Sequence, residues 1–82
     1  MSNHECSIRK IIATYKADLP EQSLEYLESL LMAGEIGVAF EDLCTIMADN
    51  DVVCHAIHIT ELSEIGTAIG IGDGIVAQLS SR

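Results

Sequence analysis

Apolar residues recur with a helical period along most of this chain. Between residues 4 and 17 they follow the spacing i, i+3, i+4, i+7, which predicts an amphipathic helix. Its apolar stripe consists of Ile8, Ile11, Ile12 and Tyr15. The opposite side carries the basic residues Arg9, Lys10 and Lys16. The first helix therefore holds all the lysine and arginine of the chain except Arg82.

A second helix is predicted to start at Pro20. Proline suits a first helical turn, where its missing N–H is not needed, and Glu21 there meets the positive end of the helix dipole. Gly34 is expected to end the helix as a C-terminal cap. The buried stripe is predicted to contain Leu24, Leu27, Leu30 and Leu31. The opposite face is predicted to contain Glu21, Glu25, Glu28 and Met32.

A third helix is predicted from residue 35 or 36 to about Asn50. On a helical wheel one side is apolar, with Ile36, Ala39, Phe40, Leu43, Ile46 and Met47. The other side carries Glu35, Val38, Glu41, Asp42, Thr45 and Asp49. Gly37 is interpreted as a glycine that lets two helices approach closely at the corner between them. Cys44 falls on the apolar side and is expected to be a small core residue.

The last third of the chain has a weaker pattern. Residues 52–59, VVCHAIHI, are β-branched enough for a strand, but no other segment looks able to pair with one, so a connector or helical turn is expected. Thr60 is the expected N-cap of a fourth helix that ends at Gly70. Residues 71–82 are expected to form a tail that packs loosely or adds a short helix. The predicted fold is a single all-α domain, residues 1–82, with about four helices and a corner at Gly34.

Composition agrees with a small folded domain and narrows the classes of molecule that could bind to it. The chain has 82 residues, 49% of them hydrophobic, and a mean hydropathy of +0.32, which argues against a disordered acidic tail. A formal net charge of −9 disfavours direct binding of nucleic acid or an anionic membrane. Three scattered cysteines, no apolar run of membrane-spanning length and no signal peptide pattern favour a cytoplasmic protein with reduced thiols.

The acidic residues are unevenly distributed. All 13 carboxylates except Glu5 lie between Lys16 and Arg82, a stretch with no lysine or arginine. An ordinary solvated surface mixes the two signs of charge, so a basic protein is the expected partner. The alternative is that these carboxylates only keep the protein in solution. The predicted partner-binding residues are Glu25, Glu28, Met32, Glu35, Val38, Glu41, Asp42 and Asp49.

Few residues are arranged for chemistry. Cys54, His55 and His58 provide only half of a zinc-ligand pattern, and the paired C-x₂₋₄-C or H-x₃₋₅-H spacing is absent, so no metal is expected. The glycine-rich GTAIGIGDGI follows a helix and lacks the lysine of a phosphate-binding loop. The sequence therefore predicts no catalytic residue, no metal and no cofactor.

One resemblance concerns QSLEYLESLL, residues 22–31. Ser23-Leu24 is similar to part of the DSL motif on which acyl carrier proteins, also small, acidic and four-helical, carry a phosphopantetheine arm. Gln22 replaces the aspartate, however, and only about 20 residues precede the serine where that family has a helix and a long loop. An acyl-carrier-like protein remains an alternative.

A second resemblance covers about residues 18–71. The segment LPEQSLEYLESLLMAGEIGVAFEDLCTIMADND, with its AGE-x-G-x-A-x-E-x-LC core, is followed by LSEIGTAIGI. This order of features resembles the Maf-type immunity family of polymorphic toxin systems and its relatives in contact-dependent growth inhibition. The resemblance implies an all-α cytoplasmic protein, without catalytic residues of its own, that binds and neutralises a cognate toxin domain, commonly a nuclease. An acidic helical protein–protein adaptor is the further alternative.

Overall fold

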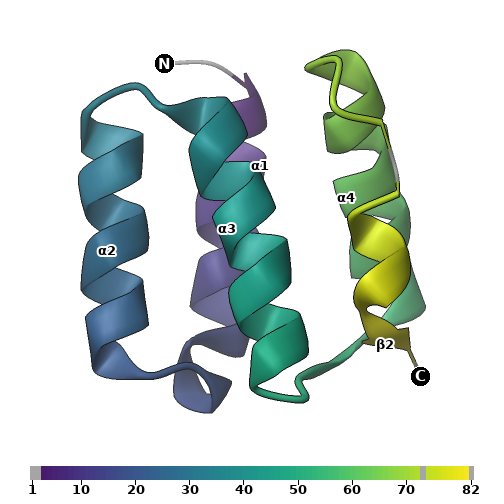
Figure 1. The fold of residues 1–82 in the computed structure, drawn as a ribbon, viewed down its shortest axis with the longest axis horizontal. Coiled ribbons are helices and arrows are strands. Elements are labelled where there is room, and N and C mark those ends of the chain that lie inside the picture. The colour runs from purple at the N-terminus through teal and green to yellow at the C-terminus, as the bar shows by residue number, and fades with distance from the viewer. Residues whose placement is uncertain (1–2, 73, 82) are drawn as a thin grey trace.

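Four α-helices form the frame of the part of the chain that the computed structural model describes, residues 3–72 and 74–81. They are α1 (Asn3–Tyr15), α2 (Glu21–Met32), α3 (Ile36–Asp49) and α4 (Ala56–Ala68). In Figure 1, α3 lies between α2 and α4, and α1 passes behind it. The all-α bundle predicted from the periodicity is confirmed.

The N-terminal helix is close to its predicted range. Ile8, Ile11 and Tyr15 turn inward and are buried, while the chain after Tyr15 tightens into a short 3₁₀ helix, η1 (Lys16–Asp18). Pro20 is the N-cap of α2, so the helix begins at Glu21, one residue later than predicted. Its extended ψ of 143° directs its carbonyl oxygen toward the backbone N–H of Leu24, 3.1 Å away.

The corner between α2 and α3 depends on Gly34. Its φ of +77° lies in the left-handed region, which glycine adopts without steric cost. This conformation lets the N–H of Gly34 donate to the Leu31 carbonyl and the N–H of Glu35 donate to the Leu30 carbonyl, at 3.0 and 2.9 Å. The predicted corner is therefore confirmed, and the two helices run antiparallel side by side (Figure 1).

The core is built around the inner face of α3. Phe40, Leu43 and Met47 are completely buried, and Cys44 is buried beside them as predicted. The other elements each contribute side chains to the same cluster: Ile8 and Ile11 from α1, Leu27 and Leu31 from α2, Leu62 and Ile65 from α4. Leu24 and Leu30, predicted to be buried, are partly exposed and pack against this cluster.

The region after α3 differs from the prediction. The fourth helix begins at Ala56 with His55 as its N-cap, so the prediction of Thr60 as the cap is wrong. The His55 carbonyl already accepts from the N–H of Ile59 at 3.1 Å, which starts the helix one turn earlier. Before it, Val53–Cys54 form a two-residue strand, β1, so the expectation of a connector or helical turn is wrong for these two residues.

The partner of β1 is the end of the chain. Ser80–Ser81 form β2 and pair with β1 in parallel, with Val53 opposite Ser80. Between α4 and β2, the short 3₁₀ helix η2 (Val76–Gln78) packs alongside α4 (Figure 1) and buries Val76 and Leu79. The expectation of a loose tail is therefore wrong for the described part of residues 71–82, and its alternative, a short helix, is confirmed.

The close approach expected at Gly37 occurs at Gly66 instead. A Cβ atom at Gly37 would meet only the Ile71 side chain, at an ordinary 3.8 Å. At Gly66, by contrast, it would overlap the carbonyl oxygen of Gly72 and lie 3.0 Å from Phe40 Cζ. The chain folds back over the end of α4 here, because the Gly66 carbonyl accepts from the N–H groups of Ile71 and Gly72, both at 2.9 Å.

This difference predicts opposite effects for two helical glycines. Gly66→Ala should destabilise the fold by about 1–3 kcal/mol, because the added methyl forces the returning backbone away. Gly37→Ala, the matched control, should be neutral or stabilising by up to about 1 kcal/mol through helix propensity alone. Urea unfolding of both variants measures the free energies. Equal stabilities for the two would contradict the proposed close approach.

Candidate functional site

The predicted partner-binding residues lie on α2, on α3 and in the corner between them. Their core-facing neighbours turn inward, so these side chains point outward. All are exposed except Asp42, which is partly buried. The two apolar members stand out, because Met32 is 75% exposed and Val38 is 44% exposed.

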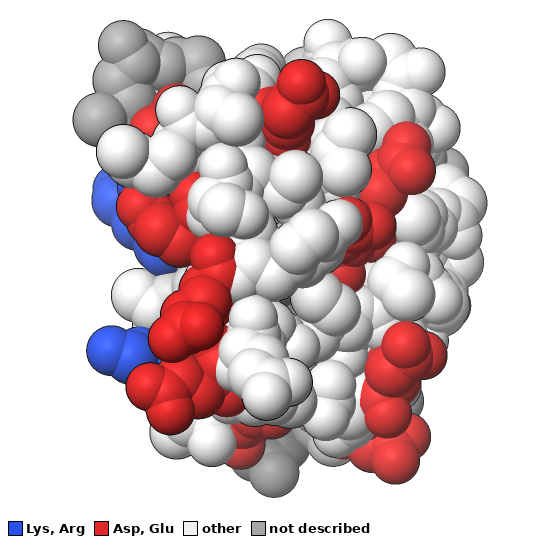
Figure 2. All heavy atoms as spheres, turned by 60° about the vertical axis from the view of Figure 1, so that its left-hand side comes forward, with Lys and Arg blue, Asp and Glu red and all other residues white. Residues whose placement is uncertain are grey.

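The carboxylates do not form one continuous patch. Figure 2 shows them in separate groups with uncharged surface between, and one group lies next to basic side chains. Two contacts of α2 explain this separation. Glu28 and Tyr26 lie on either side of the buried Leu27, at 100° per residue on the helix, and they reach different neighbours.

Glu28 reaches α1. Its Oε2 atom lies 2.6 Å from Nη1 of Arg9, whose Nε contacts Glu5 at 3.2 Å. The hydrogen bond that Arg9 donates to Glu28, followed by the one that it donates to Glu5, raises the pKa of Arg9. No basic residue lies near Glu28 in the sequence, but Arg9 of α1 lies beside it in the folded chain. This candidate site residue therefore already has a cationic partner.

Tyr26 reaches α3. Its hydroxyl donates to Oδ2 of Asp42 at 2.6 Å, and this hydrogen bond is the main reason why the pKa of Tyr26 is raised. Apart from its histidines, the chain has two tyrosines and one phenylalanine as aromatic residues. Tyr15 and Phe40 are buried, whereas Tyr26 is 47% exposed. Sequence analysis missed Tyr26, although an aromatic residue outside the leucine stripe of an amphipathic helix is a usable signal.

A polar cluster joins α1 to the start of α4. It consists of Tyr15, His55 and His58 and is called the Tyr15 cluster below. The Tyr15 hydroxyl accepts a hydrogen bond from the backbone N–H of His55 at 2.9 Å and pairs with Nδ1 of His58 at 2.6 Å. Burial, with a smaller contribution from the neighbouring Cys54, raises the pKa of Tyr15. Residues 3–72 and 74–81 contain no group of three or more His, Cys, Asp or Glu side chains placed to hold a metal ion.

The buried thiols are poorly suited to nucleophilic chemistry. Burial, and to a smaller extent the proximity of Cys54, raises the pKa of Cys44 to about 12. Since the thiolate is the reactive form, Cys44 is a packing residue at neutral pH. Cys54 is equally buried, at the edge of the Tyr15 cluster.

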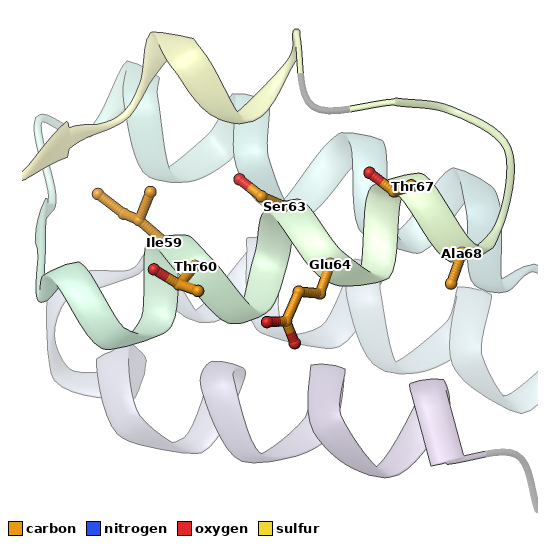
Figure 3. Close-up of a pocket in the computed structure, with 6 residues that line it drawn as sticks. All are labelled: Ile59, Thr60, Ser63, Glu64, Thr67 and Ala68. Atoms are coloured by element: carbon orange, nitrogen blue, oxygen red, sulfur yellow. The ribbon is translucent and has the colours of Figure 1, made fainter.

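The hollow drawn in Figure 3 is a shallow groove along one side of α4. Its lining residues all come from that helix: Ile59, Thr60, Ser63, Glu64, Thr67 and Ala68. Within the described residues, no side chain from a second element lines it, so no polar groups converge there on a substrate. The glycine-rich segment after α4 caps a helix C-terminus, where the dipole disfavours phosphate.

Comparison with known proteins adds no assignment. No protein-family model matches the chain, and neither a curated protein nor a solved structure is detectably similar to it. Within the described residues, every helix is too short or too polar to cross a membrane.

The two tyrosines provide a test of which polar contact holds the fold. Tyr15→Phe should destabilise the protein by about 1–2 kcal/mol, because the partly buried His55 N–H and His58 ring both lose their hydrogen-bond partner. Tyr26→Phe removes a single hydrogen bond at the surface and should have a smaller effect. Thermal and urea unfolding compare the two variants. A larger loss for Tyr26→Phe would contradict the proposed role of the Tyr15 cluster.

Proposed function

We propose that this protein is an immunity protein that binds and neutralises a cognate toxin domain, a basic nuclease, in the cytoplasm. The observation that carries this proposal is the exposed carboxylate surface of α2, the Gly34 corner and α3, on two helices that contain no lysine or arginine. The partner would be a protein, bound 1:1, and neither a cofactor nor a metal is involved.

Charge supplies the physical reason for a nuclease partner. A nuclease must hold phosphate groups, so it presents lysine and arginine around its cleft. An acidic protein can occupy such a cleft in place of the nucleic acid, and its field accelerates the encounter. The rigid helices favour this use, because they hold the carboxylates in place without a loop having to order on binding.

Apolar side chains would strengthen binding beyond what the charges provide. Charges at the rim of an interface mainly raise the association rate, whereas desolvated apolar and aromatic side chains near its centre slow dissociation. Met32 and Val38 are exposed among the carboxylates and are suited to this role. An acidic adaptor would use the same surface without blocking an enzyme. Inhibition of a nuclease, measured directly, separates the two functions.

The test uses the toxin domain encoded beside this gene and two matched fourfold variants. Neutralising Glu35, Glu41, Asp42 and Asp49 to their amides should slow association about tenfold or more at low salt, because steering can contribute 10- to 1,000-fold. The parent protein should also lose association rate steeply with salt, since the Debye length is about 10 Å at 0.1 M. Stability should stay level or rise, as like charges are removed.

The control variant removes the same number of charges elsewhere. Asp18→Asn, Asp51→Asn, Glu61→Gln and Glu64→Gln lie outside α2 and α3 and also change two aspartates and two glutamates. It should associate faster than the first variant and still abolish nuclease activity at a 1:1 ratio. Equal kinetics for the two variants would place the interface elsewhere, and a nuclease that stays active with excess parent protein would contradict the function itself.

A further inference from the structure

Tyr26 is the exposed tyrosine of the chain, and its hydroxyl faces α3. Tyr26 on α2 and Val38 on α3 are about half exposed, and Asp42 lies one helical turn after Val38. We call these three residues the Tyr26 strip. The hydrogen bond from Tyr26 to Asp42 crosses from one helix to the other, so the strip covers the seam between them.

The Tyr26 strip is arranged in advance of any binding. The 2.6 Å hydrogen bond restrains the phenol ring and fixes the Asp42 carboxylate through Oδ2. Within the described residues, the Asp42 side chain makes no other hydrogen bond or ion pair, so Oδ1 remains available as an acceptor. A restrained ring beside an available carboxylate oxygen loses little conformational entropy on binding.

Arginine fits this combination better than lysine. A guanidinium group is planar and weakly hydrated, so it can stack on an aromatic face while an edge N–H donates to a carboxylate. An ammonium group is a compact, strongly hydrated charge with no flat face to stack. The carboxylates of α2 and α3 attract any cation, whereas the tyrosine ring favours a guanidinium group over an ammonium group.

We propose that the Tyr26 strip is an arginine-selective contact, with the guanidinium stacked on Tyr26 and hydrogen-bonded to Asp42. Val38 packs against the aliphatic part of the same side chain. The inference rests on the proposed function for the identity of the partner, a basic nuclease, but its chemistry can be tested without one.

The test compares capped tri-arginine and tri-lysine peptides, which carry equal charge, by NMR titration at low salt. The parent protein should bind tri-arginine about two- to five-fold more tightly, the range that a surface cation–π contact supports. The largest shifts should fall on Tyr26, Val38 and Asp42. Equal affinity for the two peptides, or shifts centred on Glu25 and Glu28, would overturn the inference.

Three variants separate the ring from the charge. Tyr26→Leu keeps an apolar side chain and should abolish the preference for arginine, while Asp42→Asn should weaken tri-arginine binding more than tri-lysine binding. Asp51→Asn, with the same charge change just after α3, should leave the ratio of affinities unchanged. Circular dichroism checks that each variant is folded. An undiminished preference in Tyr26→Leu would contradict stacking on the ring.

Failure of the inference and failure of the function give different results. If the parent prefers tri-arginine but inhibits no nuclease, the function is wrong and the Tyr26 strip stands as an arginine-selective contact. If the parent inhibits the nuclease but binds the two peptides with equal affinity, the strip is overturned and the function stands.

Discussion

The burial of one face of α3 is the interaction on which the rest of the structure depends. Phe40, Leu43 and Met47 are fully enclosed, and α1, α2 and η2 all pack against this helix. The outer side of the same helix carries carboxylates, whose mutual repulsion opposes the compact state. Apolar contact on one side of α3 thus allows the other side to remain highly charged. A stable core face and an exposed charged face are combined in a single element.

Local periodicity was sufficient to predict the first three helices. The leucines of α2 and the Ile36–Met47 pattern of α3 determine which faces turn inward, and Gly34 determines where the chain reverses. These features are encoded within a few residues of where they act. The later elements are not. Val53 and Ser80 pair across most of the C-terminal third. The β-branched residues 52–59 are compatible with a strand, but no pattern in the sequence identifies the segment that pairs with it. The start of α4 depends on the same arrangement, because Tyr15, far away in sequence, binds the His55 N–H.

The candidate surface was predictable to a similar extent. Helical wheels placed its carboxylates outward, but they could not show which neighbour each side of α2 meets. Arg9 meets Glu28 and Tyr26 meets Asp42 only because α1 lies beside one edge of the buried face of α2 and α3 lies beside the other. The consequence is an acidic surface divided into parts with different character: one part is partly neutralised by α1, and another is bordered by an aromatic ring. Net charge alone would have described the two parts as equivalent.

The pairing of β1 with β2 also has a consequence for how the chain acquires its fold. It closes residues 53–81 into a loop that contains α4 and η2, and the Tyr15–His55 hydrogen bond and the packing of η2 on α3 also hold this loop, so its contacts join residues far apart in sequence. The contacts among α1, α2 and α3, in contrast, are already complete at Asp49 and are mostly short in sequence separation, which favours rapid folding. A growing chain can thus assemble its acidic surface first and enclose its core later. Until then the inner side of α3 that faces η2 stays open to water.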